Sequence, residues 1–555
     1  MISLLPEHQQ IKVRHPKRIV ALLLVVVCIA VFSLIFVVAQ RSGNPEQQIR
    51  PRRAGSIGDE IVVRPGASLQ SAVSSARFGD TIILEAGATY PGPLILPFKA
   101  GGTGSDNDYI TIRTSNIIGI ANEGDRIKPE IHARFMPKIV SPNERAAIGT
   151  EPQAHHYRFV GIEFSPASNA NYVYNLIDLG SSEYSSYSQF PNHLVFDRCY
   201  VHSTGMNKAR RGFALNSAET SVLNSYVSGF VGAGDETQAI AGWNGPGPFH
   251  IVNNYLEGGA EILLFGGADP SVPNLVPSDI EIRRNYLHRP KEWENRATIK
   301  GTFELKNARR VVVDGNLIES EIRTTAIVIT TRNQNGKAPW SIIEDIEVTN
   351  NIVRHASTGI NFLGSDNEHS SQEARRIRIA NNLLVDIVSV RAGDTAYFLQ
   401  LNGGNTLTVE HNTVQQEGNI ISAYGNPTRN FVLRDNIVQF SQYGIACFTP
   451  GAECPRENLF CRCIPGGVIK GNVIVDNVGA AGSDSTETKY PSGNMFTPSY
   501  DKIGFIDFRQ GNWRLAPNSN YRRKGTDGRD PGVDIDALAA SGVNSAAEGS
   551  GFRRR

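Results

Sequence analysis

The sequence predicts an all-β solenoid, a fold in which short strands wind in successive coils around one continuous core. Two observations lead to this prediction: a strand-like run recurs along most of the chain, and each run ends at a fixed polar corner that is usually asparagine. Repeats of roughly 20–50 residues are typical of folds built by stacking similar units. Length alone would instead suggest two to four separate domains.

The repeat is clearest at the residue that precedes the final apolar pair of each run. Ten runs align at this residue, namely Cys199, Ser225, Asn254, Asn285, Asn316, Asn351, Asn382, Asn412, Asn436 and Asn472, with steps of 24 to 36 residues. Valine and isoleucine alternate with polar residues in these runs, which indicates strands. A second strand-like run follows most copies, as in EILLF, GTFEL and AIVIT, so each coil should hold two or three short strands.

The recurring asparagine has two possible physical reasons. A corner residue with a positive φ is tolerated by asparagine, and we expect the corner asparagines to adopt this conformation. Their side-chain amides can also bond from one coil to the next and form a ladder. An irregular β-sandwich has no need for the same residue at every corner, so the pattern favours the solenoid.

The N-terminal end of the solenoid should be closed by a short helix, because an open coil end is an unpaired sheet edge. Ser68 is placed to cap this helix, and its buried face would comprise Leu69, Ala72, Val73 and Ala76. Gly79 should end the helix, and residues 81–84 should begin the first coil.

The C-terminal end is predicted to be closed by the segment NWRLAPNSNYRRKGTDGRDPGVDIDAL. Its aspartates, Asp527, Asp530, Asp534 and Asp536, lack the glutamate that closes an EF-hand loop, so they indicate a turn-rich cap. We therefore expect one solenoid domain over residues 58–538 and a disordered tail over 539–555.

These repeats and end segments resemble the right-handed parallel β-helix of the pectate-lyase-like superfamily, over about Ile61 to Leu538. The resemblance implies ten or more coils. It also implies a protein from a fold class that includes lyases, hydrolases, epimerases and non-catalytic adhesins, so the fold does not decide the function.

The N-terminus predicts a membrane anchor. Residues 19–39 contain no charge, and about 20 apolar residues suffice to cross a bilayer. The basic residues before this run favour a cytoplasmic tail over 1–18, followed by a transmembrane segment over 19–40 and a linker over 41–57. The alternative is a signal peptide cleaved before Gln40. Either way the main domain would lie outside the cytoplasm, in the periplasm or at the cell surface, or secreted after cleavage.

Composition excludes several classes of function. Hydrophobic residues make up 40% and charged residues 20% of the chain, which is too apolar for a disordered protein. A net charge of +1 gives no global field for nucleic acid, so no nucleic-acid partner is expected. The chain contains no P-loop, no GxSxG, no HExxH and no dinucleotide-binding fingerprint.

Candidate site residues come from the second strand-like run of successive coils. Glu304 and Lys306 are two residues apart and so share one face of a strand. Neighbouring coils add Glu261 on one side and Thr330 with Arg332 on the other. More distant coils add Asp235, Glu236, Gln238, Asn361 and Gln400. These residues form a predicted stripe of mixed charge.

The stripe suits β-elimination on an acidic, uronate-containing polysaccharide. The pair Glu304 and Lys306 is loosely similar to the glutamate and lysine strand of alginate- and chondroitin-type lyases on this fold. The resemblance implies that Lys306 is the base and that Arg332 neutralises the substrate carboxylate. Ca²⁺, if used, would be held by Glu261, Glu304 and Asp235. The alternatives are a polymer epimerase, a non-catalytic glycan-binding or adhesion protein, and charges that serve only solubility.

Two further features concern loops. Trp243 lies in GWNGPGPFH, where it offers a stacking surface for a sugar ring beside the predicted binding residues Glu236, Gln238, Asn361 and Gln400. Outside the cytoplasm, Cys447, Cys454, Cys461 and Cys463 predict two disulfides with three possible pairings. Cys28 and Cys199 are expected to remain unpaired.

Overall fold

The computed structural model describes residues 48–50, 58–102, 104–391, 393–441, 443–448, 460–476 and 490–543. The chain divides into two compact units, Met1–Gln48 and Ile49–Arg555, and the second contains the predicted solenoid. The predicted anchor and cytoplasmic tail lie outside the described residues. Within the described part, no helix is long and apolar enough to span a bilayer.

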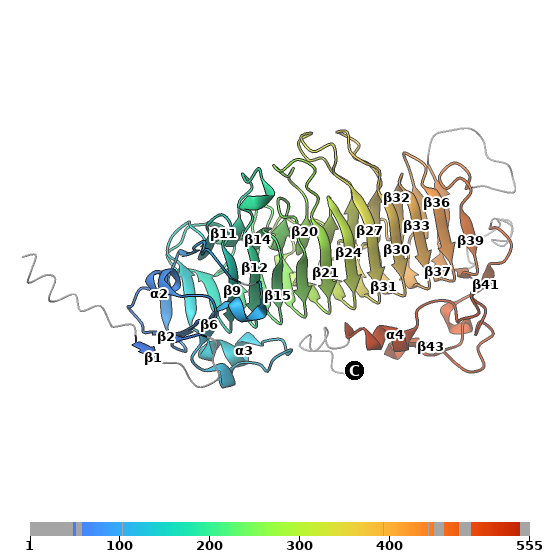
Figure 1. The fold of residues 1–555 in the computed structure, drawn as a ribbon. Helices are drawn as coiled ribbons and strands as arrows, with labels where there is room; N and C mark the ends of the chain where they lie inside the picture. The colour runs from blue at the N-terminus through green and yellow to red at the C-terminus, as the bar shows by residue number, and fades with distance from the viewer. Residues whose placement is uncertain are drawn as a thin grey trace, which may run out of the picture. The chain divides into compact units, whose positions relative to one another are not determined.

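The strands of the described residues form three long sheets, which we call the first, second and third sheet (Figure 1). The first sheet contains β1 (Gln48–Arg50), β2 (Glu60–Val63), β3 (Thr81–Leu84), β6 (Ile110–Thr114), β9 (His155–Val160), β12 (Asn192–Asp197), β15 (Thr220–Leu223), β18 (Phe249–Val252), β21 (Ser278–Arg283), β24 (Ala308–Asp314), β27 (Ile343–Thr349), β30 (Arg375–Ala380), β33 (Asn405–Glu410), β36 (Arg429–Arg434) and β39 (Val468–Lys470). The second contains β4 (Thr89–Pro91), β7 (Lys138–Ser141), β10 (Glu163–Pro166), β13 (Tyr200–His202), β16 (Tyr226–Phe230), β19 (Tyr255–Gly258), β22 (Tyr286–Arg289), β25 (Leu317–Ser320), β28 (Ile352–Ala356), β31 (Leu383–Ile387), β34 (Thr413–Gln416), β37 (Ile437–Phe440), β40 (Val473–Asp476) and β41 (Met495–Thr497). The third contains β5 (Leu94–Leu96), β8 (Ile148–Thr150), β11 (Val173–Gly180), β14 (Ala209–Asn216), β17 (Gln238–Gly242), β20 (Leu263–Phe265), β23 (Phe303–Leu305), β26 (Thr325–Thr330), β29 (Thr358–Leu363), β32 (Leu399–Asn402), β35 (Ile421–Ala423) and β38 (Ile445–Cys447).

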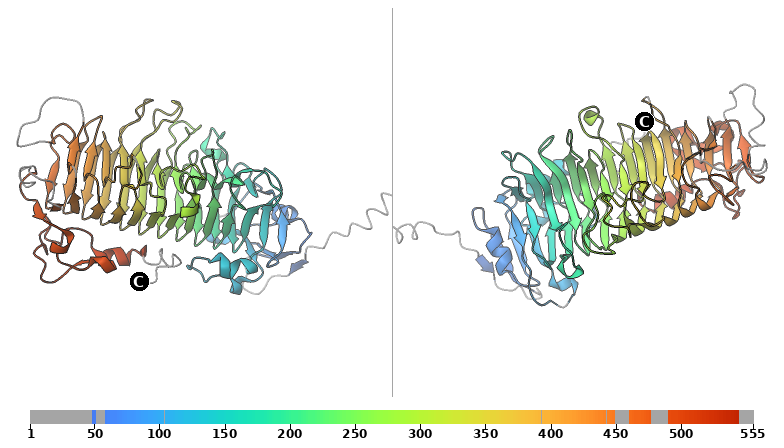
Figure 2. Two further views of the ribbon diagram at one scale, coloured as in Figure 1. Left: turned by 180° about the vertical axis from the view of Figure 1, so that it is seen from behind. Right: turned by 90° about the horizontal axis from the view of Figure 1, so that it is seen from above.

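Each coil takes one strand from each sheet in turn, so every third strand of the chain pairs in parallel with its counterpart on the next coil. Views from behind and from above show the coils following one another in chain order (Figure 2). This is the right-handed parallel β-helix that the sequence predicts. The predicted second runs are the strands of the third sheet.

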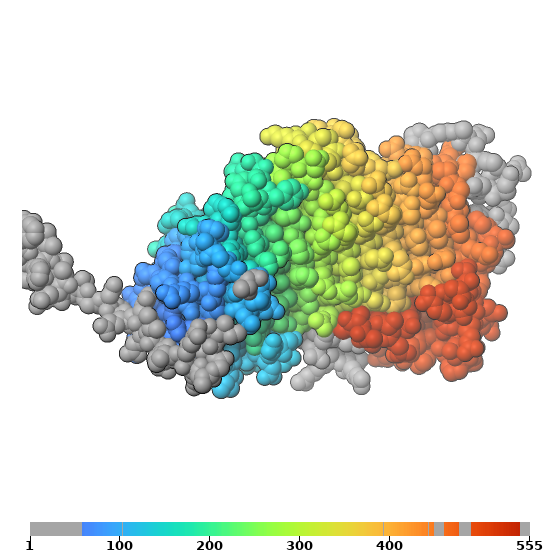
Figure 3. Space-filling view, viewed as in Figure 1, coloured from blue at the N-terminus to red at the C-terminus, as the bar shows by residue number. Residues whose placement is uncertain are grey.

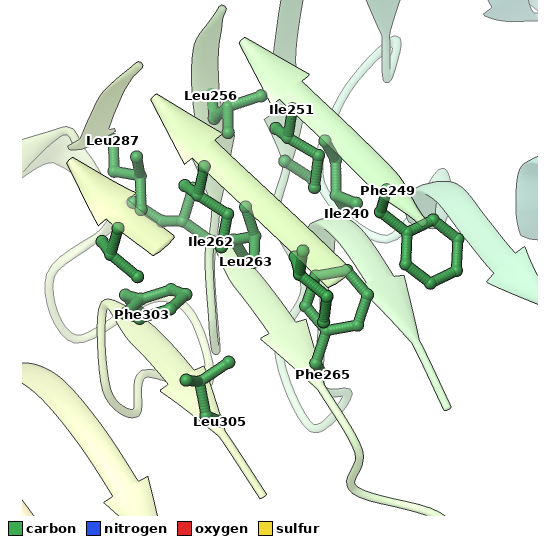
Figure 4. Close-up of a cluster of buried hydrophobic side chains, with 14 of the residues drawn as sticks. Ile240, Phe249, Ile251, Leu256, Ile262, Leu263, Phe265, Leu287, Phe303 and Leu305 are labelled. Carbon is green, nitrogen blue, oxygen red and sulfur yellow. The ribbon is translucent and has the colours of Figure 1, made fainter. Parts of the chain in front are cut away.

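The core lies inside the coils and is filled by columns of aliphatic and aromatic side chains. Residues such as Ile251, Leu287 and Phe303 come from three different sheets and meet in one cluster (Figure 4). Alternation along the strand places Phe303 and Leu305 in this core, while Glu304 between them faces away from it.

The corner asparagines form the predicted ladder, but their backbone differs from the prediction. The amide of Asn316 donates to Asn351 Oδ1 at 2.9 Å, and Asn351 donates to Asn382 Oδ1 at 3.0 Å. The positive φ falls on the preceding residue, as at Asn350 (55°) and Asn381 (55°), and not on the ladder asparagine. The amide bonds therefore explain the asparagine, and one further member, Asn494, accepts from Asn472 at 2.9 Å.

The N-terminal helix is α2 (Leu69–Ser75), and Ser68 Oγ accepts from the backbone N–H of Ser71 as predicted. The helix ends before Gly79, because the chain is already extended at Ala76. The other described helices are α3 (Pro129–His132) and α4 (Ile535–Ala540), with short 3₁₀ turns at η1 (Asp106–Asp108), η2 (Ile117–Gly119), η3 (Ala133–Phe135), η4 (Tyr187–Gln189), η5 (Lys291–Trp293), η7 (Tyr500–Lys502) and η8 (Phe508–Gln510).

The C-terminal segment, residues 505–543, folds back along the side of the solenoid (Figure 3). It contains the antiparallel pair β42 (Phe505–Asp507) and β43 (Asn512–Leu515), followed by α4. The ordered packing continues past residue 538, since Val543 is buried; residues 544–555 lie outside the described residues.

Hydrogen bonds fasten this segment to successive corners of the solenoid. Thr526 Oγ1 donates to Asp435, His411 Nε2 lies 3.1 Å from Asp527 Oδ2, and the N–H of Asp534 donates to Asn381. Of the predicted cap aspartates, Asp527 and Asp534 therefore hold the segment in place across several coils.

The cysteines agree with the disulfide prediction where they are described. Cys447 is bonded to Cys463, and Cys461 is also disulfide-bonded. Cys199 is buried and free, as expected. Cys454 and Cys28 lie outside the described residues.

Candidate functional site

The predicted stripe lies on the outer face of the third sheet and follows two columns of outward side chains. In the first column, register places Leu264, Glu304, Val328, Asn361 and Gln400 side by side on consecutive coils. The second column begins at Lys306. Loops that leave this sheet project from the coils around β20 to β29 (Figure 1).

A cleft of about 570 Å³ lies at the N-terminal half of this face. Its lining includes the predicted residues Glu236, Gln238, Trp243 and Lys306, and it also includes Asp178, Arg210, Arg211 and Lys300. A second cleft of about 310 Å³ adjoins it and contains Lys306, Arg332, Asn361 and Asp366. Lys306 and Gln334 line both, so the two clefts form one groove along the third sheet.

Glu261 lies beneath the first cleft and is fully buried. Its Oε2 accepts from Gln238 Nε2 at 2.7 Å, whereas its Oε1 has no hydrogen-bond partner. Burial, together with the nearby negative charge of Glu304, raises the pKa of Glu261. An unpartnered carboxylate oxygen in such a place costs stability, which marks it as a candidate functional group.

Glu304 and Lys306 form an ion pair of 3.2 Å, with side chains only 6% and 16% exposed. Glu304 also accepts from the backbone N–H of Gly301 at 3.2 Å. A side chain at position 301 would collide with the Glu304 carboxylate, because an added Cβ would lie 2.6 Å from its Oε1. Gly301 thus makes room for the Glu304 carboxylate.

Two cations, Arg289 and Lys300, lie near these carboxylates. Arg289 is fully buried and donates to backbone carbonyls, including those of Ala260 at 2.8 Å and Gly301 at 2.9 Å. Burial lowers the pKa of Arg289 to about 10, and the charges of Glu261 and Glu304 oppose this. Lys300 lies 3.9 Å from Glu261 and also contacts Glu236.

A relay of polar side chains crosses the floor of the first cleft from coil to coil. Asn175 donates to Asp178 at 3.1 Å, Arg211 Nη1 donates to Asn175 at 3.2 Å, and Arg211 Nε donates to Gln238 at 2.9 Å. Gln238 in turn donates to Glu261. Burial raises the pKa of Asp178 to about 6, so the relay connects two carboxyl groups that both resist ionisation.

Aromatic rings stack against the arginines at the side of this cleft. The Arg211 guanidinium lies 5.0 Å from the Trp243 ring and 5.1 Å from the Tyr174 ring. Arg210 covers the same tyrosine at 4.8 Å. Trp243 therefore supports an arginine in the cleft, which is a different contact from the sugar stacking expected for it.

The remaining predicted residues are distributed as follows. Asp235 accepts from Tyr172 and pairs with Arg210 at 3.3 Å, so its carboxylate oxygens are already bound by these two groups. Arg332 pairs with Asp366 at 3.0 Å and faces the second cleft. Thr330 and Asn361 line that cleft as well, and Gln400 follows Asn361 on the next coil.

Sequence reasoning missed Asp178, Arg211, Lys300 and Arg289. Asp178 lies in β11, before the first aligned run, and Arg211 lies in β14, after the run that has Cys199 instead of asparagine at its corner, so the asparagine signal is absent from both coils. Arg289 ends a second-sheet strand and turns inward, which the alternating pattern does not reveal. Lys300 lies outside any strand.

Of the residues expected to hold Ca²⁺, Glu261 and Glu304 have the carboxylate oxygens that this ion prefers. Glu261 and Glu304 supply neighbouring carboxylates, one of which has an unpartnered buried oxygen. Oxygen atoms of water and substrate would have to complete the six to eight ligands that this ion takes. Among the described residues, only His411, Asp435 and Asp527 bring three ligand atoms of the His, Cys, Asp and Glu types together, and they lie at the C-terminal segment.

The three parallel sheets define the chain as a right-handed parallel β-helix protein. No family model matches the sequence, and no curated protein matches it. Among solved structures, it is similar to the PL6 family alginate lyase AlyGC, with 12% identity and a TM-score of 0.45, over 86% of this chain and 58% of that one. It is also similar to pectate lyase Pel9A, with 13% identity, a TM-score of 0.37, and coverage of 85% and 93%. A third is the catalytic unit of a GH87 α-1,3-glucanase from Streptomyces thermodiastaticus, with 12% identity, a TM-score of 0.45, and coverage of 77% and 70%.

These similarities concern the fold alone. The chain spans less than two thirds of the alginate lyase.

Proposed function

We propose that the protein binds an acidic polysaccharide in the groove of the third sheet and cleaves it by β-elimination. The observation that carries this proposal is the position of Lys306, whose side chain lines both clefts and is held by a buried carboxylate. An open, fully hydrated pair of Glu304 and Lys306 would instead have favoured a surface that only binds or solubilises. A chain laid along the groove would pass directly over the lysine.

In the proposed reaction, Lys306 accepts the proton from the carbon next to the uronate carboxyl group. The electron pair forms a carbon–carbon double bond, the bond to the leaving oxygen breaks, and that oxygen takes a proton from water. The hydroxide so formed takes the proton from Lys306, which regenerates the base. Arg332, which is oriented by Asp366, is assigned to the substrate carboxylate. Its charge acidifies the carbon that loses the proton.

The Glu261 and Glu304 pair is assigned to Ca²⁺ within this proposal. The ion would supply positive charge next to the substrate carboxylate. Lys306 must be neutral to accept the proton, and Glu304 can hold its nitrogen in place through their contact of 3.2 Å.

The proposed place of action is outside the cytoplasm, whether the chain is anchored or secreted. The bond between Cys447 and Cys463 supports this, because disulfides persist in oxidising compartments.

The test uses the purified full chain with alginate, polygalacturonate and chondroitin sulfate, each with Ca²⁺ or with a chelator. Unsaturated uronate is followed by its ultraviolet absorbance. We expect a signal on one polymer that falls at least about a hundredfold in Lys306→Ala and persists in Lys337→Ala, which removes an exposed loop lysine. A signal that is unchanged in Lys306→Ala would refute the assigned base.

A second candidate is a non-catalytic glycan-binding protein. It is favoured by the fact that Lys300, Lys306, Arg210 and Arg332 are each paired with a carboxylate of the protein itself. Retention of a polymer without any cleavage, and without deuterium exchange into the polymer from heavy water, would select this function over the lyase and over an epimerase.

A further inference from the structure

The second outward column of the third sheet continues well beyond Lys306. Pairing places Thr330 beside Leu363 and Leu363 beside Asn402. The N–H of Tyr424 donates to Leu401 O at 2.9 Å, and that of Phe448 donates to Ala423 O at 2.7 Å, so these two residues extend the same column by two further coils. The column thus runs from the proposed base to a pair of aromatic residues.

The surface between these ends carries no charge on its floor. The adjacent first column supplies Val328, Asn361, Gln400 and Ser422 over the same coils. Asn361 lines the second cleft, and its Oδ1 is a buried acceptor without a hydrogen-bond partner. Neutral amides and hydroxyls in a row are suited to the hydroxyl groups of a sugar chain, and the free acceptor marks one position where a donor is missing.

The two aromatic side chains are exposed to solvent, although burying large apolar groups is favourable. Phe448 is 60% exposed and Tyr424 is 36% exposed. Burial raises the pKa of Tyr424, and the positive charge of Arg332 opposes this rise. Tyr424 is therefore close enough to interact with Arg332, which lines the second cleft. Cys447, directly before Phe448, is bonded to Cys463, which restrains the backbone that carries the ring.

We propose that Tyr424 and Phe448 form an aromatic subsite for the far end of the polysaccharide whose reacting unit lies at Lys306. At a coil spacing of ~4.8 Å, the rings lie about 19 and 24 Å from the lysine along the axis. The flat apolar faces of sugar rings stack on such aromatics. This subsite rests on the proposed function, and it adds that the protein selects long chains over short ones.

The test compares binding and cleavage for chains of different length. Alginate, polygalacturonate and chondroitin sulfate are used as whole polymers and as purified trisaccharides, with the full chain and its Tyr424→Ala/Phe448→Ala variant. We expect the variant to bind the preferred polymer at least about tenfold more weakly in affinity electrophoresis, while its activity or affinity toward the trisaccharide stays within twofold. Tyr443→Ala is the matched control, since Tyr443 is 71% exposed on the same coil but precedes β38 at its other end.

The outcomes separate the subsite from the lyase. If the protein cleaves or binds a polymer and the double variant equals the wild type, the subsite is wrong and the lyase proposal is untouched. If the polymer is retained but never cleaved, and the double variant loses retention, the subsite stands without the lyase. If no polymer is retained or cleaved, both are overturned. A loss that Tyr443→Ala reproduces would also overturn the subsite, and equal thermal unfolding of the variants excludes a folding defect.

Discussion

The replacement Asn351→Leu should destabilise the solenoid strongly, because it removes a fully buried member of the ladder. Asn351 Oδ1 accepts from the backbone N–H of Asn316 at 3.0 Å and from its side-chain amide at 2.9 Å, and Asn351 Nδ2 donates to Val313 O at 2.9 Å. Leucine has a similar size but removes all three bonds. The Asn316 side-chain amide keeps its bond to Ile282 O at 2.9 Å, whereas the Asn316 N–H and Val313 O lose the partners named here. At about 1–3 kcal/mol for each of these two groups, the free energy of unfolding should fall by about 2–6 kcal/mol.

The assay is urea unfolding followed by circular dichroism, together with hydrogen exchange at the Asn316 amide. The midpoint should shift to lower urea, and exchange at Asn316 should accelerate. Asn520→Leu, at an exposed position in the C-terminal segment, should change the free energy of unfolding by less than about 0.5 kcal/mol. A change below about 1 kcal/mol for Asn351→Leu would refute the view that the ladder amides are essential.

Three other predictions follow from the site and from the C-terminal end. The pKa of Asp178 is raised to about 6 from 3.8, so as the pH rises the unfolded chain loses this proton before the folded chain does. The free energy of unfolding should therefore decrease as the pH rises from 4 to 6. In Asp178→Asn, the melting temperature should depend less on pH over this range. Replacing both Cys447 and Cys463 by serine should lower stability by up to about 3 kcal/mol, given the 16-residue separation, and faster proteolysis near β38 would reveal it. The hydrogen bonds from Arg529 and the charge of His411 lower the pKa of Asp527 to about 2. The stability that the Asp527 carboxylate contributes should therefore be present above pH 4 and be lost as the pH falls toward 2. In Asp527→Asn, hydrogen exchange at the Thr526 amide should be faster at pH 7 and should change less when the pH is lowered.

The stacked architecture was predictable because a single residue type marks the same point of every coil. Once Asn316 and Asn351 are aligned, alternation assigns Phe303 to the core and Glu304 to the outside, and the structure agrees. The backbone conformation at the corner was not predictable in detail, since the sequence does not say which of two neighbouring residues has the positive φ. Asparagine is favoured at the corner both because it tolerates a positive φ and because its amide can form hydrogen bonds. At the ladder position only the hydrogen bonding applies, since the positive φ lies on the preceding residue.

The candidate site was predictable only where it coincides with the repeat. Lys306 and Arg332 follow aligned strands, so their register could be inferred. Asp178 and Arg211 belong to coils without the corner signal, and they enter the site through a relay of hydrogen bonds between side chains that lie far apart in the sequence. A pattern of alternating polarity contains no information about such a relay, nor about Arg289, which satisfies its charge on backbone carbonyls inside the protein.

The C-terminal segment has a consequence for how the molecule comes apart. A stack whose coils contact only their neighbours frays from its open end, one coil at a time. Here Thr526 is tied to Asp435, Asp534 to Asn381, and Ser541 lies against Gly315, so one length of chain fastens the corners of several coils like a brace. The last coil can unfold only when the C-terminal segment detaches, and this segment is also bonded to coils in the middle of the stack. The C-terminal half should therefore open as a single cooperative block, and tension applied at the end of the chain should be shared among many coils.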